Sequence, residues 1–259
     1  MKPTAALADV GARGLIVKRT RRRFSRIPTL AGGKDRRPYW ILRNVTMEVN
    51  PGEALFIVDS STHRRQTVMR LMSGLVDPDE GSVVVPPRSL LLPVPRFRQV
   101  KTLSIGQSLR LLAGIHGMTD REIDERFDSI AERAGVRRII HRPVDETSSF
   151  MLRQLAFCVA TSAPVNLLAL DSMAEVGTQG FRPTCVPQLQ DLMSKGMALV
   201  VVSRDPKLLR TLATRVVLLT AKGAAPVDPD TAVQVMRTMR SEARVGRRRT
   251  DEDDRDDEV

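Results

Sequence analysis

The stretch that decides the fold runs from Glu53 to Leu75 and reads EALFIVDSSTHRRQTVMRLMSGL. An apolar segment, Ala54–Val58, leads into a short polar loop. After the loop, apolar side chains recur at the spacing of one helix face, at Val68, Leu71, Met72 and Leu75. The stretch therefore predicts a strand, a loop and a helix with the dimensions of a phosphate-binding loop.

The loop keeps this layout without the chemistry that binds phosphate. In the motif G-x-x-x-x-G-K-[ST], glycines let backbone N–H groups face the phosphates, the lysine neutralises them and the hydroxyl holds Mg²⁺. Here these positions are Asp59, Arg64, Arg65 and Gln66. Thr62 and Arg64 would be strained wherever the motif needs a positive φ. At this point the sequence is compatible with an NTPase, with a protein that was formerly an NTPase, and with a protein that is neither.

Composition favours an α/β protein. The 259 residues suit one large domain or two small ones. Aromatic residues make up only 3% of the chain, and its apolar residues are mainly Leu, Val, Ala and Met. This mixture indicates helices packed on a parallel sheet rather than a β-sandwich.

The charge is strongly asymmetric. The formal net charge is +11, yet the last nine residues, DEDDRDDEV, carry −6, so residues 1–250 hold about +17. Such a basic body suggests a polyanionic neighbour, either nucleic acid or an anionic membrane surface. A solvated, arginine-rich surface without a particular partner explains the same charge.

Several classes of protein lack support in the sequence. Cys158 and Cys185 show no metal-like spacing, and the three histidines are scattered, so we expect neither a disulfide framework nor a metal site. No apolar run approaches the roughly 18 residues that span a bilayer, and the N-terminus lacks a signal-type apolar core. We therefore expect a soluble or peripheral protein.

The organisation predicted along the chain has three parts. Residues 1–13 are expected to form a leader, residues 14–223 a domain with a helical subdomain over about 100–160, and residues 224–259 a C-terminal helix with a disordered basic and acidic tail. Strands and helices are predicted from periodicity and turn residues. They lie at Gly14–Lys18, Ile41–Val49, Ser82–Val85, Ile105–His116, Asp120–Ala134, after Ser149, at Val165–Leu170, Phe181–Lys195, Ala198–Ser203, Lys207–Ala213, Arg215–Thr220 and Thr231–Ser241.

An ordered series of landmarks over residues 14–223 resembles the ATP-binding subunit of ABC transporters. The resemblance is greatest to the branch that exports capsular and other surface polysaccharides. It implies a P-loop NTPase-like nucleotide-binding domain with a mainly parallel sheet and a helical subdomain. The landmarks are Pro51-Gly52-Glu53, Arg70–Leu75, Leu103–Gly117, Thr147-Ser148-Ser149, Leu170-Asp171 and Val200–Asp205.

The same resemblance implies that the catalytic positions are altered. Ser172 stands at the general base, Arg204 at the γ-phosphate sensor, Thr178 at the aspartate that crosses to the partner, and Phe150 at the signature glycine. Gln99 is the nearest candidate for the Q-loop glutamine. We therefore expect no catalytic residue to be functional and no resident cofactor, with weak residual ATP binding at most.

Five residues keep a nucleotide-contacting position by this resemblance. They are Trp40, Arg65, Thr67, Ser148 and Asp171. Trp40 corresponds to the aromatic residue that stacks on adenine, although it could equally anchor the second strand. Arg65 keeps the charge of the motif lysine, Thr67 keeps a hydroxyl, and Asp171 is the Walker B aspartate.

The loop substitutions also suggest an internal ion pair. Two guanidiniums, from Arg64 and Arg65, can fill the volume in which phosphates would lie, and Asp59 is close enough in sequence to pair with one of them. Together with Phe150, these side chains would make the ATP-free state the resting state.

Two functions follow from these expectations. The first is a catalytically inactive ABC-type subunit with a structural or regulatory role in polysaccharide export. It would lie on the cytoplasmic face of the cell membrane and pair with a membrane subunit, an intact ATPase paralogue, or a second copy. The alternative is a stand-alone basic protein that recruits an anionic polymer or membrane surface through Lys18–Arg26 and Arg244–Arg249, with nucleic acid the less favoured partner.

Overall fold

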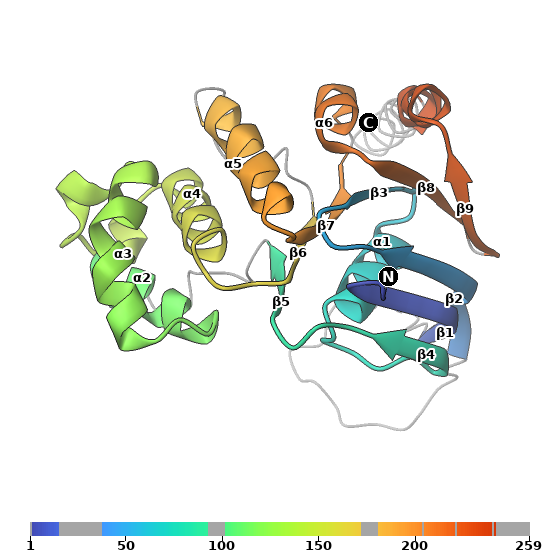
Figure 1. Ribbon diagram of the computed structural model, residues 1–259, viewed down its shortest axis with the longest axis horizontal. Coiled ribbons are helices and arrows are strands. Elements are labelled where there is room, and N and C mark those ends of the chain that lie inside the picture. The colour runs from blue at the N-terminus through green and yellow to red at the C-terminus, as the bar shows by residue number, and fades with distance from the viewer. Residues whose placement is uncertain are drawn as a thin grey trace, which may run out of the picture.

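The computed structural model describes residues 2–15, 38–92, 102–171, 181–203, 205–220, 222–239 and 241. A three-stranded antiparallel sheet and a six-stranded sheet dominate this part of the chain (Figure 1). The small sheet has the order β2 (Pro38–Val49), β1 (Ala5–Leu15) and β4 (Glu80–Val84). The large sheet has the order β5 (Ser89–Leu92), β6 (Leu167–Asp171), β7 (Ala198–Val202), β3 (Ala54–Val58), β8 (Arg215–Thr220) and β9 (Gly223–Val227).

Helices flank the large sheet, whose strands are parallel except for β9. Two of the helices, α2 and α3, begin with capping boxes, Ser104 with Gln107 and Thr119 with Glu122, which satisfy their first N–H groups. Helices α2, α3 and α4 form one end of the molecule (Figure 1). The helices are α1 (Thr62–Met72), α2 (Ile105–Ile115), α3 (Asp120–Arg133), α4 (Ser149–Ala160), α5 (Arg182–Ser194), α6 (Pro206–Leu212) and 229–239, with short 3-10 helices η2 (Arg137–Ile139) and η3 (Val144–Glu146).

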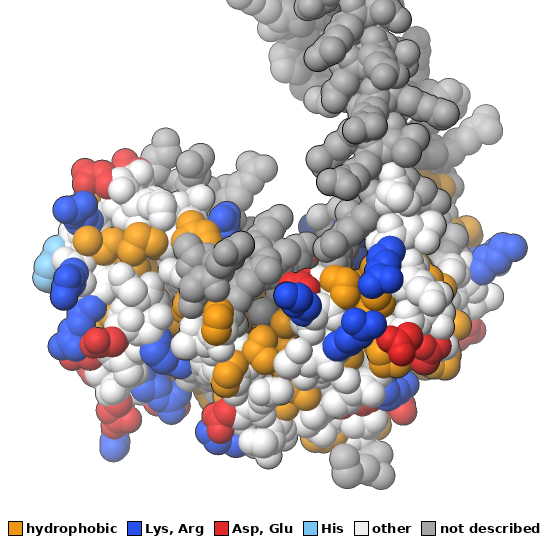
Figure 2. Space-filling view, turned by 90° about the horizontal axis from the view of Figure 1, so that it is seen from above, with side chains coloured by type: hydrophobic (Ala, Val, Ile, Leu, Met, Phe, Trp, Pro, Cys, Tyr) orange, Lys and Arg blue, Asp and Glu red, His pale blue; other side chains and the backbone are white. Residues whose placement is uncertain are grey.

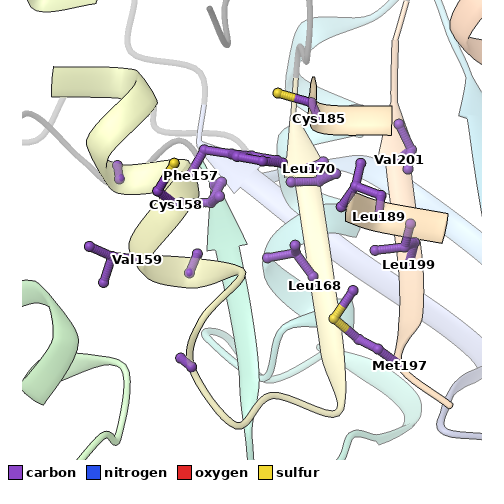
Figure 3. Close-up of a cluster of buried hydrophobic side chains, with 14 of the residues drawn as sticks. Phe157, Cys158, Val159, Leu168, Leu170, Cys185, Leu189, Met197, Leu199 and Val201 are labelled. Carbon is purple, nitrogen blue, oxygen red and sulfur yellow. The ribbon is translucent and has the colours of Figure 1, made fainter. Parts of the chain in front are cut away.

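The parallel sheet is buried on both faces, and β3 shows why. Its residues alternate between two cores: Phe56 belongs to one cluster, and Leu55 and Ile57 belong to the other. One core lies between the sheet and α2, α4, α5, α6 and residues 229–239; in its part shown in Figure 3, side chains of α4, β6, α5 and β7 meet. In the other core, α1 lies between the two sheets. Burial on two faces explains the continuous apolar run of β3.

The main prediction about the fold is confirmed. The segments Ala54–Val58, Leu167–Leu170 and Ala198–Val202 lie in one sheet, with β7 hydrogen-bonded to both β3 and β6. The three helices predicted between residues 105 and 162 are present as α2, α3 and α4. The boundaries proposed for the domain and the tail stay predictions.

The N-terminal part of the prediction was wrong. Strand β1 begins at Ala5, inside the segment expected to be a leader, and not at Gly14. Its pairing with β2 contains register shifts, one of them next to Asp9, whose φ is +50°. Such bulges break the alternation of apolar and polar residues by which a strand is recognised. The arginine-rich loop predicted after β1 and the tail lie mostly outside the described residues.

Two short strands were also missed. β5 has only four residues, SLLL, without alternation, and β9 contains Pro226. Proline cannot donate a ladder hydrogen bond and is tolerated in β9 because this strand is at the edge of the sheet.

A matched pair of glycines tests the close approach of β4 to the bulge in β1. Gly81 and Gly135 both have positive φ, +81° and +69°, but a Cβ at Gly81 would lie 2.4 Å from the Asp9 carbonyl oxygen, whereas one at Gly135 would meet nothing within 4 Å. We expect Gly135→Ala to lower the free energy of unfolding by about 1–2 kcal/mol, and Gly81→Ala by about 3–5 kcal/mol because overpacking adds to the strain. Urea denaturation measures both, and equal losses would contradict the packing seen at Gly81.

Candidate functional site

The candidate site lies at the carboxyl edge of the parallel sheet. β7 lies between β3 and β6, and its Val202 pairs with Ile57 on one side and with Asp171 on the other. The β3–α1 loop, residues 59–61, and the Walker B position, Asp171, therefore emerge at the same edge. In α/β sheets this edge is where ligands bind.

The loop is short and enters the helix directly. Ser61 is the N-cap of α1, and its Oγ accepts a hydrogen bond from the N–H of Arg64 (3.3 Å). Among the described residues, Asp9 and Asn44 are the non-glycine residues with positive φ, so residues 59–66 contain none. The strain expected at Thr62 and Arg64 is therefore absent. Both residues lie in helix α1 and not in a loop that needs glycine to reach positive φ.

The carboxylate of Asp59 is the centre of the loop. It is buried, with 1% of its side chain exposed, and Arg64 binds it in a fork: Nε to Oδ2 at 2.8 Å and Nη2 to Oδ1 at 2.7 Å. The Ser61 N–H also donates to Oδ1 (2.8 Å). The hydrogen bond to Asp59 raises the pKa of Arg64, which opposes the effect of burial. The predicted ion pair within the loop is confirmed.

Arg65 forms a second set of hydrogen bonds within the loop and the start of α1. Its guanidinium is buried and donates from Nη1 to the carbonyl oxygen of Asp59 (2.8 Å) and from Nη2 to Thr62 Oγ1 (3.3 Å). Asp59 thus accepts from Arg64 and the Ser61 N–H through its carboxylate, and from Arg65 through its carbonyl oxygen. Both arginines of the altered motif are engaged by the loop itself.

The other expected contact residues are distributed over several elements. Thr67 donates its hydroxyl hydrogen bond to the carbonyl of His63, one turn back in α1 (2.8 Å). Ser148 is the N-cap of α4, where Oγ accepts from the Met151 N–H (3.2 Å). Of the five expected residues, the structure thus brings Arg65 and Asp171 to the same sheet edge. Roles in nucleotide contact remain predictions, and Gln99, Ser172, Thr178 and Arg204 lie outside the described residues.

Trp40 lies in the small sheet, where an arginine covers its ring. Arg13, its register partner on β1, places its guanidinium carbon 4.2 Å from the ring centroid, and that of Arg43 lies at 5.4 Å. The ring also lies against Gly11, because a Cβ there would come within 2.7 Å of it. These contacts link β2 to β1. The sequence analysis missed Arg13 because the register depends on bulges in β1.

Phe150, at the position of the signature glycine, lies in the first turn of α4. Its ring is half-buried and lies 5.9 Å from the guanidinium carbon of Arg153. An aromatic side chain thus adds bulk at a helix N-terminus where a glycine would leave the backbone accessible. The helix predicted after Ser149 is therefore present, and its first turn carries a bulky ring.

The described residues contain no group of three or more His, Cys, Asp or Glu side chains that could hold a metal ion. Within the same residues, none of the helices is long and apolar enough to cross a bilayer.

Comparison with known proteins is consistent with this geometry. A family model described as "ABC transporter" matches residues 42–175. The teichoic acids export ATP-binding protein TagH of Listeria monocytogenes is 26% identical over 179 residues, covering 69% of this chain and 53% of that protein. The ABC transporter protein AbcA of Aeromonas salmonicida is 28% identical over 195 residues, covering 71% and 60%. The chain thus spans about half to three-fifths of the length of these relatives.

Solved structures share the fold. The ATP-binding subunit of an ABC transporter superposes with a TM-score of 0.68 at 13% identity, covering 91% of this chain and 99% of that one. The ATP-binding cassette MJ0796, in a dimeric post-hydrolysis state bound to ADP and Pi, gives 0.67 at 15% identity, covering 86% and 99%. At these identities the likeness concerns the fold alone.

A double-mutant cycle tests the ion pair in the loop. Asp59→Ala and Arg64→Ala should be non-additive, with a coupling energy of about 1–3 kcal/mol in urea denaturation, because Arg64→Ala leaves the buried Asp59 carboxylate without its cation, whereas this cost is absent once Asp59 is also replaced. The control cycle combines Asp59→Ala with Arg70→Ala, since Arg70 is exposed near the end of the same helix. Additivity within about 0.3 kcal/mol for Asp59 and Arg64 would show that the pair is not formed in solution.

Tryptophan fluorescence tests whether Arg13 shields the ring of Trp40 from solvent. Trp40 is the only tryptophan in the chain, so the signal reports on this residue alone. We expect Arg13→Ala to increase quenching by acrylamide and to lower the free energy of unfolding by about 0.5–1 kcal/mol, the worth of an exposed cation–π contact. Arg43→Ala is the matched control and should change quenching less, because its guanidinium is farther from the ring. An equal response of the two variants would rule out Arg13 as the main cover.

Proposed function

This chain belongs to the ABC transporter family, and from that membership and the geometry of its β3–α1 loop we propose that it is a non-hydrolysing ABC-type subunit with a structural or regulatory role in the export of a surface polysaccharide. The observation that carries the proposal is the buried fork between Asp59 and Arg64. The fork and the Ser61 N–H close the start of α1 around a carboxylate of the chain itself, where a phosphate-binding loop would face a nucleotide phosphate.

The altered residues of the sequence support the absence of hydrolysis. Ser172 cannot accept a proton from water at neutral pH as a glutamate does, and Arg204 replaces the histidine of the switch strand. Removal of one charge-stabilising group commonly costs a factor of about 10²–10³ in rate. Because these residues serve separate parts of phosphoryl transfer, the losses accumulate.

The setting in polysaccharide export comes from the relatives. TagH is named for the export of teichoic acids, and the motif at Thr147-Ser148-Ser149 resembles that of the polysaccharide branch. We propose that this chain works at the inner face of the cell membrane with an export membrane subunit. An intact ATPase protomer would supply hydrolysis, and a dimer is the arrangement described for the structural relative MJ0796.

Calorimetric titration with Mg-ATP tests the proposal. We expect the unaltered chain to show no binding at micromolar nucleotide and no turnover above background. Rebuilding the loop with Asp59→Gly, Thr62→Gly, Arg64→Gly, Arg65→Lys and Gln66→Ser should restore binding, because the glycine backbone and the ammonium become available. Hydrolysis should stay absent while Ser172 remains.

The matched control carries the same loop but has Arg65→Ala in place of Arg65→Lys. It should bind nucleotide much more weakly, because the charge that neutralises phosphate is missing. Circular dichroism shows whether each variant is folded, and Asp59→Ala alone provides a milder change. Micromolar Mg-ATP binding by the unaltered chain, or turnover that is lost on Asp171→Asn, would overturn the proposal.

Co-purification distinguishes this function from the alternative of a stand-alone basic protein. Recovery of the chain with an intact ABC ATPase or an export membrane subunit supports the proposed role. Salt-sensitive binding to an anionic polymer, lost when the arginines of 18–26 and 244–249 are replaced and accompanied by no transporter component, supports the alternative.

A further inference from the structure

A cavity, remote in sequence from the β3–α1 loop, lies where α3, the end of α4 and α5 meet. It has a volume of about 430 Å³, within the range of small-molecule sites. Two arginines of α3 line it, Arg126 and Arg133, together with Lys195 at the end of α5. Lys and Arg side chains, with Asp and Glu among them, are prominent at this helical end of the molecule (Figure 2, left).

The two arginines are held in place by the carboxyl end of α4. Arg126 donates from Nη1 to the carbonyl oxygen of Ser162, and Arg133 donates from Nη2 to the Ser162 hydroxyl and to the carbonyl of Cys158 (3.4 Å). Each of these bonds uses one terminal nitrogen of the fork. The guanidiniums are thereby oriented while other N–H groups remain available to a ligand.

The positive charge around the cavity is only partly compensated. Lys195 pairs with Asp191 at 2.6 Å, and Arg126 has the Glu122 carboxylate at 4.0 Å. In the described part of the chain, Arg133 makes its hydrogen bonds to neutral oxygens of Cys158 and Ser162 and forms no ion pair. Three cations thus share one cavity with the single carboxylate that lines it.

The hydroxyl groups at the end of α4 are already hydrogen-bonded within the helix, so the donors for an anion are the cationic side chains. Thr161 and Ser162 donate their hydroxyl hydrogens to the carbonyls of Phe157 (2.8 Å) and Cys158 (2.7 Å). These bonds and the arginines compensate the partial negative charge at the helix end. Gln188 donates from Nε2 to Thr161 Oγ1 (2.7 Å), which fixes its amide at the wall.

We propose that this cavity is a binding site for a phosphate-type oxyanion, either inorganic phosphate or the phosphate group of a small monoester. Arg133 is the principal donor, because it forms no ion pair within the described residues and its bonds to Cys158 and Ser162 use Nη2 alone, which leaves the Nη1 and Nε N–H groups for phosphate oxygens. Lys195 adds a point charge. The site is separate from the nucleotide position and does not depend on the proposed function.

Titration with inorganic phosphate tests the proposal, followed by the arginine side-chain Nε–H signals in NMR at constant ionic strength. We expect a saturable shift of the Arg133 signal, identified by its absence from the Arg133→Ala spectrum. Binding should weaken about tenfold or more in Arg133→Ala and by less in Arg133→Lys, which keeps the charge and loses the planar set of N–H donors. Arg121→Ala is the matched control, because Arg121 is exposed on the same helix and paired with Glu125.

A parallel titration with glycerol 3-phosphate distinguishes the two sources of the anion. Tighter binding of the monoester identifies a phosphorylated small molecule, whereas equal or weaker binding identifies free phosphate. The proposal is overturned if the shifts do not saturate, if Arg121→Ala weakens binding as much as Arg133→Ala, or if Arg65→Ala abolishes binding that Arg133→Ala retains. The last outcome would place the anion at the β3–α1 loop.

Discussion

A carboxylate held out of water must be compensated by the groups around it, and the form of the β3–α1 loop follows from this requirement at Asp59. The carboxylate receives a two-point fork from Arg64 and a backbone N–H from Ser61. Arg65 binds the carbonyl of the same residue. The loop therefore needs neither glycine nor an external anion to satisfy its donors, which is why helix α1 can begin at Thr62 without strain.

The sheet determines where this closed loop is placed. Because β3, β6 and β7 are buried on both faces, their registers are fixed by two cores rather than one. Asp171 and the loop consequently meet at one edge even though the ligand-binding chemistry of that edge has changed. Fold and site chemistry have separate causes here. Continuous apolar runs in the strands determine the fold, and a few residues of the β3–α1 loop determine the chemistry of the site.

The sequence was sufficient where a physical signal is local. Continuous apolar runs located β3 and β7, and the short separation of Asp59 from Arg64 and Arg65 was enough to expect an ion pair. It was insufficient where the cause is tertiary. The bulges of β1 hide its alternation, β9 is a strand despite Pro226, and the cover of Trp40 by Arg13 depends on that bulged register. Which arginine binds the carboxylate and which binds the carbonyl depends on the start of α1.

The mutual dependence of Asp59 and Arg64 has an evolutionary consequence. Restoring glycine at position 59 alone leaves the guanidinium of Arg64 without its carboxylate, and restoring glycine at position 64 alone leaves a buried carboxylate without its cation. Each single change to glycine is therefore expected to destabilise the loop, because it leaves one member of the pair without its partner. A change to glycine at both positions would therefore pass through a destabilised intermediate unless the two residues changed together.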